Sequence, residues 1–400
     1  MVAEQHHDNV NERGERLRIL IAGGGTGGHV YPGLAVAEAL LTERPDSEVR
    51  FAGTRRGLEY LVVPKSGFRL HTIPASGFRG LGVLSRIRFL LNFSAGLIGS
   101  LCLLLTWRPA VILGTGGYVS APVLAAARLF RCPCALQEQN AFPGSANRLI
   151  ARWAKRIYLG FAEAAEQFPG RSCLITGNPV RASFSADFVP PASEKEVPPR
   201  LSAEAAPQQL HVLIFGGSRG ARTLNNAVIE AAAEWLNEPS LALWIQTGIS
   251  QQAEVAAAYA HFPTERVQIT PYLFNMPAAL AWADLAVCRA GAMTLAELHT
   301  MGKPAVLVPF PHATDNHQLK NASACEKRGA AVVIEDAECT GEVLVAQVAG
   351  LAENRERLAE MGRGAASLAK PEAARLIAQD LLRLAEGDPL TEGVEADHVS

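Results

Sequence analysis

A C-x-x-C spacing is absent from this 400-residue sequence. Its seven cysteines are scattered along the chain, and their number is odd. Such a set is typical of reduced thiols in a cytosolic protein. An apolar leader is also absent, because the first sixteen residues are polar, and we therefore predict no secretory signal. At about 150 residues per domain, the length favours two or three domains, and a hydrophobic content of 48% is ample for their cores.

A strong excess of charge of one sign is missing too, since the formal net charge is −2, but the charge is unevenly spread. Residues 17–181 carry 19 Lys and Arg against 8 Asp and Glu, a balance of +11, whereas residues 182–400 carry −11. A basic first half could face phosphates or an anionic membrane surface, or it could be ordinary solvated charge. We predict no nucleic acid partner.

Glycine is plentiful, and its most informative run is Gly23-Gly24-Gly25-Thr26-Gly27-Gly28-His29. The apolar stretch Arg18–Ala22 predicts a strand before this run, and Tyr31–Thr42 predicts a helix after it. Glycines let a backbone approach a ligand closely, and the N–H groups and dipole at a helix start favour an anion. We therefore expect a phosphate-binding turn with His29 at its mouth.

No acidic residue ends the second predicted strand, Glu48–Ala52, which runs into Gly53-Thr54-Arg55-Arg56. Gly23, Gly25 and Gly28 fit the pattern G-x-G-x-x-G, but a dinucleotide site also needs an acid about 20 positions on to hold ribose. An arginine could still serve NADP. The missing acid therefore disfavours an NAD(P)-dependent oxidoreductase without excluding it.

Charged residues are missing from Phe89–Trp107, a stretch of nineteen residues. This length approaches that of a membrane span, but polar residues and glycines dilute the stretch, and a predicted strand, Ala110–Leu113, follows at once. Three interpretations remain open. The segment is a membrane span, a helix buried against the sheet, or a helix whose outer face touches lipid, with Arg79, Arg86 and Arg88 near the headgroups.

Three further polar or glycine-rich segments follow predicted strands of the first half. They are Gly114-Thr115-Gly116-Gly117-Tyr118, the loop Glu138–Arg148, and Gly177-Asn178-Pro179-Val180-Arg181. Open α/β sheets bind ligands at the carboxyl ends of their strands, so these are expected ligand loops. Arg181 is a candidate contact for a phosphate or carboxylate, or an ordinary surface arginine. Paired prolines and charges in 186–208 predict an interdomain linker.

The second half repeats the strand, turn and helix pattern at Gly216–Ala221 and again at Arg289–Glu297. A carboxylate at Glu297 could accept hydrogen bonds from both hydroxyls of a ribose, although the spacing of Thr294 and Glu297 also fits a capping box. The polar segment Phe310–Asn321 carries hydrogen-bonding groups suited to a sugar. These features predict a nucleotide-sugar site in the second half.

Together these motifs resemble, in order and spacing, those of the bacterial MurG-type N-acetylglucosaminyltransferases of peptidoglycan synthesis, over nearly all of residues 17–385. The motifs are Gly23–His29, Gly114–Tyr118, Glu138–Asn140, Gly177–Arg181, Gly216–Ser218, Arg289–Glu297 and Pro309–Gln318. The resemblance implies an α/β GT-B fold, with two doubly wound Rossmann-like domains facing a cleft. The implied division is a tail 1–16, an acceptor and membrane-association domain 17–185, the linker 186–208, a UDP-GlcNAc domain 209–385 whose last helix packs back on the first, and a tail 386–400.

The resemblance also implies the reaction. An inverting hexosyltransferase moves GlcNAc from UDP-GlcNAc to the C4 hydroxyl of undecaprenyl-diphosphate-MurNAc-pentapeptide, converting lipid I to lipid II for the cell wall, and with it for cell shape and division. Such an enzyme is peripheral on the cytoplasmic face of the inner membrane, with the apolar and basic patch around Phe78–Phe93 resting on the lipid. It requires no cofactor, and cell-wall synthesis proteins are candidate partners.

By motif match, the resemblance assigns a donor site and an acceptor site. For the donor, Glu297 takes the ribose hydroxyls, Gln318 the GlcNAc hydroxyls, and Ser218 and Arg181 approach the diphosphate. The uracil and diphosphate region is held by the backbone of Leu273 and the turn Ala292, Met293, Thr294 and Leu295. The first domain closes the donor site with Thr26, Gly27, Gly28 and Asn140. The acceptor diphosphate is assigned to Gly24, Gly25, Gly116, Gly117 and Tyr118.

Inverting transfer needs a general base at the acceptor hydroxyl and relief of charge on the leaving UDP. His29 is the candidate base, because a helix N-terminus disfavours imidazolium and favours the neutral, basic form. Alternatively, His29 only hydrogen-bonds the acceptor, and Glu138 is the base. The family usually has His-Glu-Gln-Asn where this chain has Gln137-Glu138-Gln139-Asn140, so that first histidine is missing here.

No D-x-D-like pair of acids ends a predicted strand, and we therefore predict no obligatory metal. Two other functions stay open beside the transferase. A UDP-GlcNAc 2-epimerase of the same fold would need several carboxylates in the cleft, where only Glu138 and Glu297 are evident. A non-catalytic nucleotide-sugar binding protein would carry the same donor motifs.

Overall fold

The computed structural model describes residues 16–75, 83–185, 187–188, 209–217, 220–263, 265–313 and 316–387, without the side chains of 83–86. Several expectations fall outside these ranges. They concern Ser218, nearly all of the linker 186–208, the tails 1–16 and 386–400 apart from residues 16, 386 and 387, and the part of the basic apolar patch at Phe78 and Arg79.

The first sheet has seven parallel strands in the order β3-β2-β1-β4-β5-β6-β7. The strands are β1 (Arg18–Gly23), β2 (Glu48–Gly53), β3 (Arg69–Thr72), β4 (Val111–Gly116), β5 (Cys134–Glu138), β6 (Arg156–Leu159) and β7 (Cys173–Ile175). The helices between them are α1 (Gly27–Glu43), α2 (Glu59–Lys65), α3 (Val83–Trp107), α4 (Ser120–Leu129) and α5 (Ser145–Ile150), with short 3₁₀ helices at Ala151–Trp153 and Ala162–Gln167. Helices on both faces bury the apolar strands β1 and β4, as expected for a parallel sheet.

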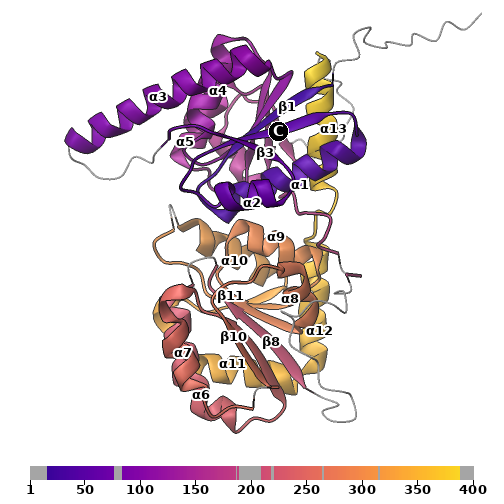
Figure 1. The fold of residues 1–400 in the computed structure, drawn as a ribbon. Coiled ribbons are helices and arrows are strands. Elements are labelled where there is room, and N and C mark those ends of the chain that lie inside the picture. The colour runs from indigo at the N-terminus through magenta and orange to yellow at the C-terminus, as the bar shows by residue number, and fades with distance from the viewer. Residues whose placement is uncertain are drawn as a thin grey trace, which may run out of the picture.

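The second sheet has six parallel strands in the order β10-β9-β8-β11-β12-β13. The strands are β8 (Leu210–Phe215), β9 (Leu241–Gln246), β10 (Val267–Thr270), β11 (Leu285–Cys288), β12 (Ala305–Leu307) and β13 (Ala331–Val333). The helices are α6 (Arg222–Leu236), α7 (Gln252–Ala258), α8 (Met276–Trp282), α9 (Ala292–Thr300), α10 (His317–Lys327), α11 (Gly341–Glu353), α12 (Arg355–Ser367) and α13 (Ala373–Glu386), with 3₁₀ turns at Ile249–Gln251 and Asp336–Glu338. Each sheet has its own core, and Figure 1 shows one α/β unit above the other.

Both sheets reverse their strand order once, and open α/β sheets bind ligands beside such a reversal. In the first sheet the reversal lies between β1 and β4, which end in the two glycine turns that begin at Gly23 and Gly114. In the second it lies between β8 and β11, which lead to Gly216 and to Arg289. The topology therefore gathers the glycine motifs at the two places best suited to bind ligands.

Helix α13 belongs to the end of the chain but packs on α1 of the first domain (Figure 1). Its buried face includes Ile377 and Leu381, which join the core around Leu34. The hydroxyl of Tyr158 donates to Asp380 Oδ2 at 2.7 Å. The chain therefore passes from the first domain to the second and back again.

Helix α3 extends away from the body of the first domain (Figure 1). Its C-terminal part packs through Leu104 and Trp107, whereas Ile87, Leu91 and Ile98 are exposed. The stretch Ile87–Trp107 is long and apolar enough to cross a membrane, and 22% of its apolar window is buried. The interpretation of α3 as a helix buried against the sheet is therefore wrong for most of its length.

Two further expectations need correction. Helix α1 begins at Gly27 rather than near Tyr31, so His29 lies within its first turn. Helix α9 begins at Ala292 with Gly291 as N-cap and without a side-chain cap, so Thr294 and Glu297 do not form a capping box. Glu297 instead lies in the second turn of α9, where its carboxylate is not needed to complete the helix end.

Candidate active site

The first glycine turn is held by a buried acid that the sequence did not reveal. Glu59 Oε2 accepts the backbone N–H of Gly25 at 2.8 Å, and Oε1 accepts both the N–H and the hydroxyl of Thr54, each at 2.8 Å. A Cβ on Gly24 would lie 2.4 Å from Glu59 Oε1. The N–H of Gly25 is therefore already paired with a carboxylate, and the first N–H groups of α1, at Gly27 and Gly28, are the ones suited to an anion.

The two glycine turns of the first domain touch each other. A Cβ on Gly117 would lie 2.3 Å from the carbonyl oxygen of Gly24, and the φ of Gly117 is +78°. Ser120 fixes the contact, because its hydroxyl donates to the carbonyl of Ala22 at 2.7 Å and accepts the N–H of Gly116 at 3.0 Å. Tyr118 is exposed beside the turn. The expected acceptor residues are therefore brought together.

His29 lies against the second glycine turn. Its Nδ1 is 3.1 Å from the carbonyl oxygen of Thr115, which can only accept, so Nδ1 carries the hydrogen and Nε2 of the neutral ring keeps its lone pair. Burial lowers the pKa of His29, and the nearby Glu138 carboxylate acts in the opposite direction. A Cβ on Gly116 would lie 2.6 Å from Nδ1. The histidine is thus held in its basic form with a fixed ring.

Glu138 is buried at the end of β5 and is surrounded by donors. Its Oε1 accepts the backbone and side-chain N–H groups of Asn140 at 2.9 and 3.1 Å, and its Oε2 accepts from Asn147 Nδ2 at 2.7 Å. These three hydrogen bonds fix the carboxyl group and use three of its about four acceptor positions. This arrangement suits a group that acts on His29 through its charge rather than one that removes a proton itself.

Gln137, which stands where the family usually has histidine, is buried in a network of amides. Its Oε1 accepts from Gln139, and its Nε2 donates to Asn178 Oδ1 at 3.1 Å. Asn178 Nδ2 in turn donates to the carbonyl of Gln139 at 2.9 Å. Gln137 therefore ties the loop after β5 to the segment that leaves the first domain.

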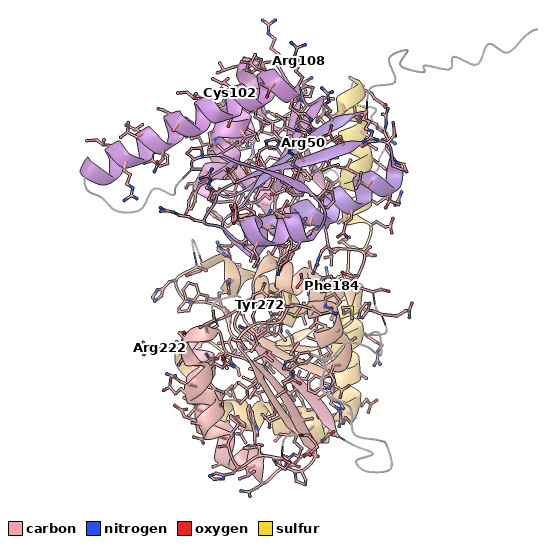
Figure 2. The ribbon with its side chains drawn as sticks, in the orientation of Figure 1. Arg50, Cys102, Arg108, Phe184, Arg222 and Tyr272 are labelled. Carbon is pink, nitrogen blue, oxygen red and sulfur yellow. The ribbon has the colours of Figure 1, made fainter. Side chains whose placement is uncertain are left out.

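Arg181 lies where the two domains meet. Its guanidinium is 4.9 Å from the ring centre of Tyr31 on α1 and 5.4 Å from that of Phe184, which packs into the core of the second domain. Figure 2 shows Phe184 and Tyr272 at this junction. The Nε of Arg181 is buried and has no hydrogen-bond partner among the described residues. A buried, unpartnered guanidinium N–H is suited to an anionic ligand.

Glu297 faces the same junction from α9. Burial raises its pKa to about 7, and the positive charge of Arg181 acts in the opposite direction. Its charge also contributes to the raised pKa of the Tyr31 hydroxyl, whose hydroxyl partner is Tyr272. The structure therefore brings two expected donor residues, Arg181 from the crossing and Glu297 from the second domain, near Tyr31 of the first domain.

The other expected donor residues of the second domain that the structure describes lie in α9, in α10 and just before α8. Ala292, Met293 and Leu295 are buried in its first turns, and Thr294 is half-buried beside them. Leu273 is buried in the same core cluster. Gln318 Oε1 accepts the N–H of Phe310 at 3.0 Å, which leaves the amide N–H groups of Gln318 to donate.

A second residue that sequence reasoning missed supports this region. Arg289 Nη1 donates to the carbonyls of Val308 and Pro309 at 3.0 and 3.1 Å and also bonds Asp336. It thereby fixes the loop that carries Gln318 to the strand that leads into α9. Among the residues that the structure describes, no three His, Cys, Asp or Glu side chains gather as metal ligands.

Comparison with known proteins agrees with this geometry. The model of the glycosyltransferase family 28 N-terminal domain matches residues 19–159, and that of the family 28 C-terminal domain matches residues 211–379. The chain belongs to glycosyltransferase family 28. Its two family 28 domains correspond to the two sheets described above.

Curated relatives are similar to this chain over almost their whole length. A protein of Anaeromyxobacter sp. (strain Fw109-5) is 43% identical over 377 residues, 93% of this chain and 96% of its own. A Geobacter sulfurreducens protein is 41% identical over 368 residues, with 92% and 98% covered. Both are named UDP-N-acetylglucosamine--N-acetylmuramyl-(pentapeptide) pyrophosphoryl-undecaprenol N-acetylglucosamine transferase.

Among solved structures, MurG of Acinetobacter baumannii is 30% identical with a TM-score of 0.68, covering 92% of this chain and 99% of that one. A UDP-GlcNAc 2-epimerase of Neisseria meningitidis, bound to UDP-GlcNAc, is 13% identical with a TM-score of 0.63, covering 92% and 100%. The second likeness shows the fold alone. The expected GT-B architecture of two Rossmann-like domains is confirmed.

Proposed function

We propose that this chain transfers GlcNAc from UDP-GlcNAc to the C4 hydroxyl of undecaprenyl-diphosphate-MurNAc-pentapeptide, with inversion at the anomeric carbon. One observation carries the proposal. Helices α1 and α9, which carry the candidate base His29 and the candidate ribose ligand Glu297, contact each other where the two domains meet. The identity of 41–43% to transferases of this name supports the same reaction.

In this proposal His29 is the general base. Its Nδ1–H donates to the carbonyl of Thr115, and Nε2 accepts the proton of the acceptor hydroxyl as oxygen attacks the anomeric carbon. The lowered pKa keeps the ring neutral at physiological pH. Glu138 then favours the imidazolium that forms, since it supplies a negative charge nearby without giving up its three hydrogen bonds. Glu138 is thus a positioning residue and not the base.

The leaving UDP is stabilised from the second domain. The N-terminus of α9 at Ala292 offers unpaired N–H groups, and Arg181 offers its unpartnered Nε. Glu297 accepts the ribose hydroxyls, Gln318 donates to the GlcNAc hydroxyls, and Leu273 holds the uracil through its backbone.

The acceptor diphosphate binds at the touching glycine turns. We reassign Gly27 and Gly28 from the donor site to this diphosphate, because their N–H groups are the first of α1. Gly117 lets the two turns touch, and Gly116 leaves room for the ring of His29. Gly25 donates no hydrogen bond to the diphosphate, because its N–H is paired with Glu59. Asn140 and Thr26 close the donor site from the first domain. Tyr118 flanks the acceptor diphosphate.

The lipid chain of this acceptor lies in a membrane, and α3 is the segment suited to meet it. Its exposed Ile87, Leu90, Leu91 and Ile98 would enter the headgroup region. We propose a peripheral enzyme on the cytoplasmic face of the inner membrane, consistent with the reduced cysteines of the described residues.

The test is transfer of labelled GlcNAc from UDP-GlcNAc to a short-chain MurNAc-pentapeptide diphosphate lipid, with EDTA present. We expect product, and we expect His29→Ala to lose most of the turnover at saturating substrates. Saturable UDP-GlcNAc binding without transfer would favour a nucleotide-sugar binding protein. Conversion of UDP-GlcNAc to its 2-epimer would favour the epimerase. Near wild-type turnover in His29→Ala would remove the base assignment.

A further inference from the structure

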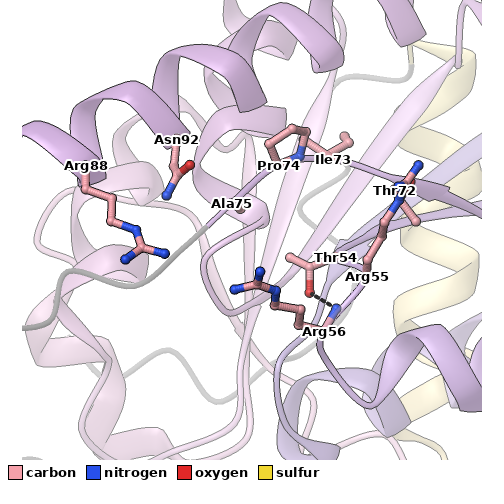
Figure 3. Close-up of a pocket in the computed structure, with 9 residues that line it drawn as sticks. All are labelled: Thr54, Arg55, Arg56, Thr72, Ile73, Pro74, Ala75, Arg88 and Asn92. Atoms are coloured by element: carbon pink, nitrogen blue, oxygen red, sulfur yellow. Dashed lines mark hydrogen bonds between the residues drawn. The ribbon is translucent and has the colours of Figure 1, made fainter.

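A basic groove lies in the first domain, beside the glycine turns but outside the site described above. It has a volume of about 520 Å³, within the range of small-ligand sites. Figure 3 shows its lining, with Arg55 and Arg56 from the loop after β2 and Arg88 from α3. The rest of the lining is Thr54, Thr72, Ile73, Pro74, Ala75 and Asn92.

The three arginines bring positive charge to this groove without a matching acid. No Asp or Glu of the described residues forms an ion pair with Arg55, Arg56 or Arg88. The acid of the same loop, Glu59, is buried and bonds Gly25 and Thr54 instead. Guanidinium groups bind carboxylates in pairs of parallel hydrogen bonds, so the groove has the chemistry of an anion site.

Its position relative to the acceptor turn is fixed by the sheet. The strands β3, β2 and β1 are neighbours, with Gly53 opposite Thr72 and Ala22 opposite Ala52. At about 4.8 Å between neighbouring strands, the end of β3 is about 10 Å from the end of β1, where the first glycine turn begins. An extended peptide of five residues reaches about 17 Å. A peptide attached to a sugar at the glycine turns can therefore reach the groove.

The groove also lies on the inner side of α3. Arg88 and Asn92 are one helical turn apart on the face that continues to Gly96, and a Cβ on Gly96 would lie 2.4 Å from the carbonyl oxygen of Pro74. Leu91 and Ile98, two turns apart, are exposed on another face of α3. The groove thus lies on the side of α3 that faces the edge of the sheet, away from the apolar surface that would meet lipid.

We propose that this groove binds a free carboxylate of the acceptor's peptide, through Arg55, Arg56 and Arg88. The proposal rests on the function proposed above, since it assumes a peptide-bearing acceptor at the glycine turns. The groove is thereby assigned to recognition of the peptide, and binding of a phospholipid headgroup in it is the alternative that the experiment tests.

The experiment compares two short-chain acceptors in neutral detergent, one with the pentapeptide and one without it. The variant is Arg55→Gln/Arg56→Gln, and the matched control is Arg69→Gln, at the opposite end of β3 and also exposed. For the wild type and the control we expect a higher kcat/KM with the peptide. In the variant this preference falls about tenfold, which corresponds to about 1.4 kcal/mol. An acceptor whose peptide carboxylates are all amidated should behave with the wild type as the peptide-free one does.

Three outcomes would overturn the proposal. The first is an unchanged preference in the variant, and the second is an equal loss with both acceptors, which would point to the diphosphate or to misfolding. The third is a loss seen only when vesicles of anionic phospholipid are added, which would assign the groove to a headgroup. If the wild type transfers no GlcNAc to either acceptor, the proposed function fails. Calorimetry with soluble pentapeptide and its amide then tests the groove alone, and equal binding of the two would overturn the proposal.

Discussion

The hydroxyl groups of Tyr31 and Tyr272 lie 3.3 Å apart and join the two domains across their junction. Tyr31 comes from the helix that carries His29, and its ring also supports the Arg181 guanidinium. Tyr272 precedes Leu273, the expected uracil contact. The pair thus links the acceptor side to the donor side at the place where transfer is proposed.

Replacing Tyr31 by Phe removes this link and keeps the ring under Arg181. A hydrogen bond of this kind contributes about 0.5–1.5 kcal/mol, so we expect KM for UDP-GlcNAc to rise up to about tenfold. Tyr31→Ala should cost more, because Arg181 also loses its aromatic support. Steady-state kinetics at saturating acceptor measure both. An equal effect of the two substitutions would argue against a role of the ring.

The charge of Glu138 is expected to set the pH dependence of the reaction. Its charge raises the pKa of His29, so Glu138→Gln should lower that pKa further and move the acid limb of kcat/KM for the acceptor to lower pH. We expect kcat to fall about 10- to 100-fold as well, because the imidazolium formed in the transition state loses its counter-charge. A fall in kcat with an unmoved acid limb would mean that Glu138 only holds the loop.

Glu297 makes donor binding depend on pH near neutrality. Its carboxyl has a pKa of about 7, and only the ionised form accepts both ribose hydroxyls, so KM for UDP-GlcNAc should rise as the pH falls through 7. Glu297→Gln should flatten this dependence and raise KM at pH 8. Because the raised pKa means that the charged form destabilises the fold, the variant should also have a higher Tm than the wild type at pH 8, but not at pH 5.

Gly116 is expected to tolerate no side chain. A Cβ there would lie 2.6 Å from His29 Nδ1, and its φ of +102° is strained for alanine. Gly116→Ala should therefore lower kcat by at least about tenfold while KM for UDP-GlcNAc changes little, because the donor side is untouched. Gly144→Ala, where a Cβ would meet nothing within 4 Å, is the matched control. Full activity in Gly116→Ala would show that the ring position is not critical.

The apolar face of α3 should decide membrane binding. Leu90→Glu/Leu91→Glu places two charges on that face, and we expect sedimentation with vesicles of anionic phospholipid to be lost. Activity on a short-chain acceptor in detergent should remain. Ile249→Glu, an exposed position on the second domain, is the control and should sediment as the wild type does. Sedimentation of the α3 variant would place the membrane contact elsewhere.

The sequence was sufficient to locate the glycine turns, because strand, turn and helix follow one another within about ten residues. It was insufficient for Glu59, because the partner of this acid, Gly25, is 34 residues away. The spacing of Thr294 and Glu297 misled for a local reason. The N-cap residue of α9 is Gly291, whose backbone is extended, so Thr294 lies inside the helix and does not cap it.

The junction itself could not be predicted from local pattern. Tyr31 and Tyr272 are 241 positions apart, and no local sequence pattern around either residue indicates the other as its partner. Gln137 is a similar case, since its amide partners come from the loop after β5 and from Asn178 after β7. The tyrosine contact depends on how two complete domains meet, and the Gln137 network depends on how the first sheet assembles.

The return of α13 to the first domain gives the molecule two covalent connections instead of one. The second, between Ser367 and Ala373, passes Gly177 so closely that a Cβ there would lie 2.4 Å from that of Lys370. Two connections side by side act as a pivot: one domain can rotate about them, but sliding the domains apart would stretch both. A rotation of this kind would part Tyr31 and Tyr272 and keep the packing of α13 on α1.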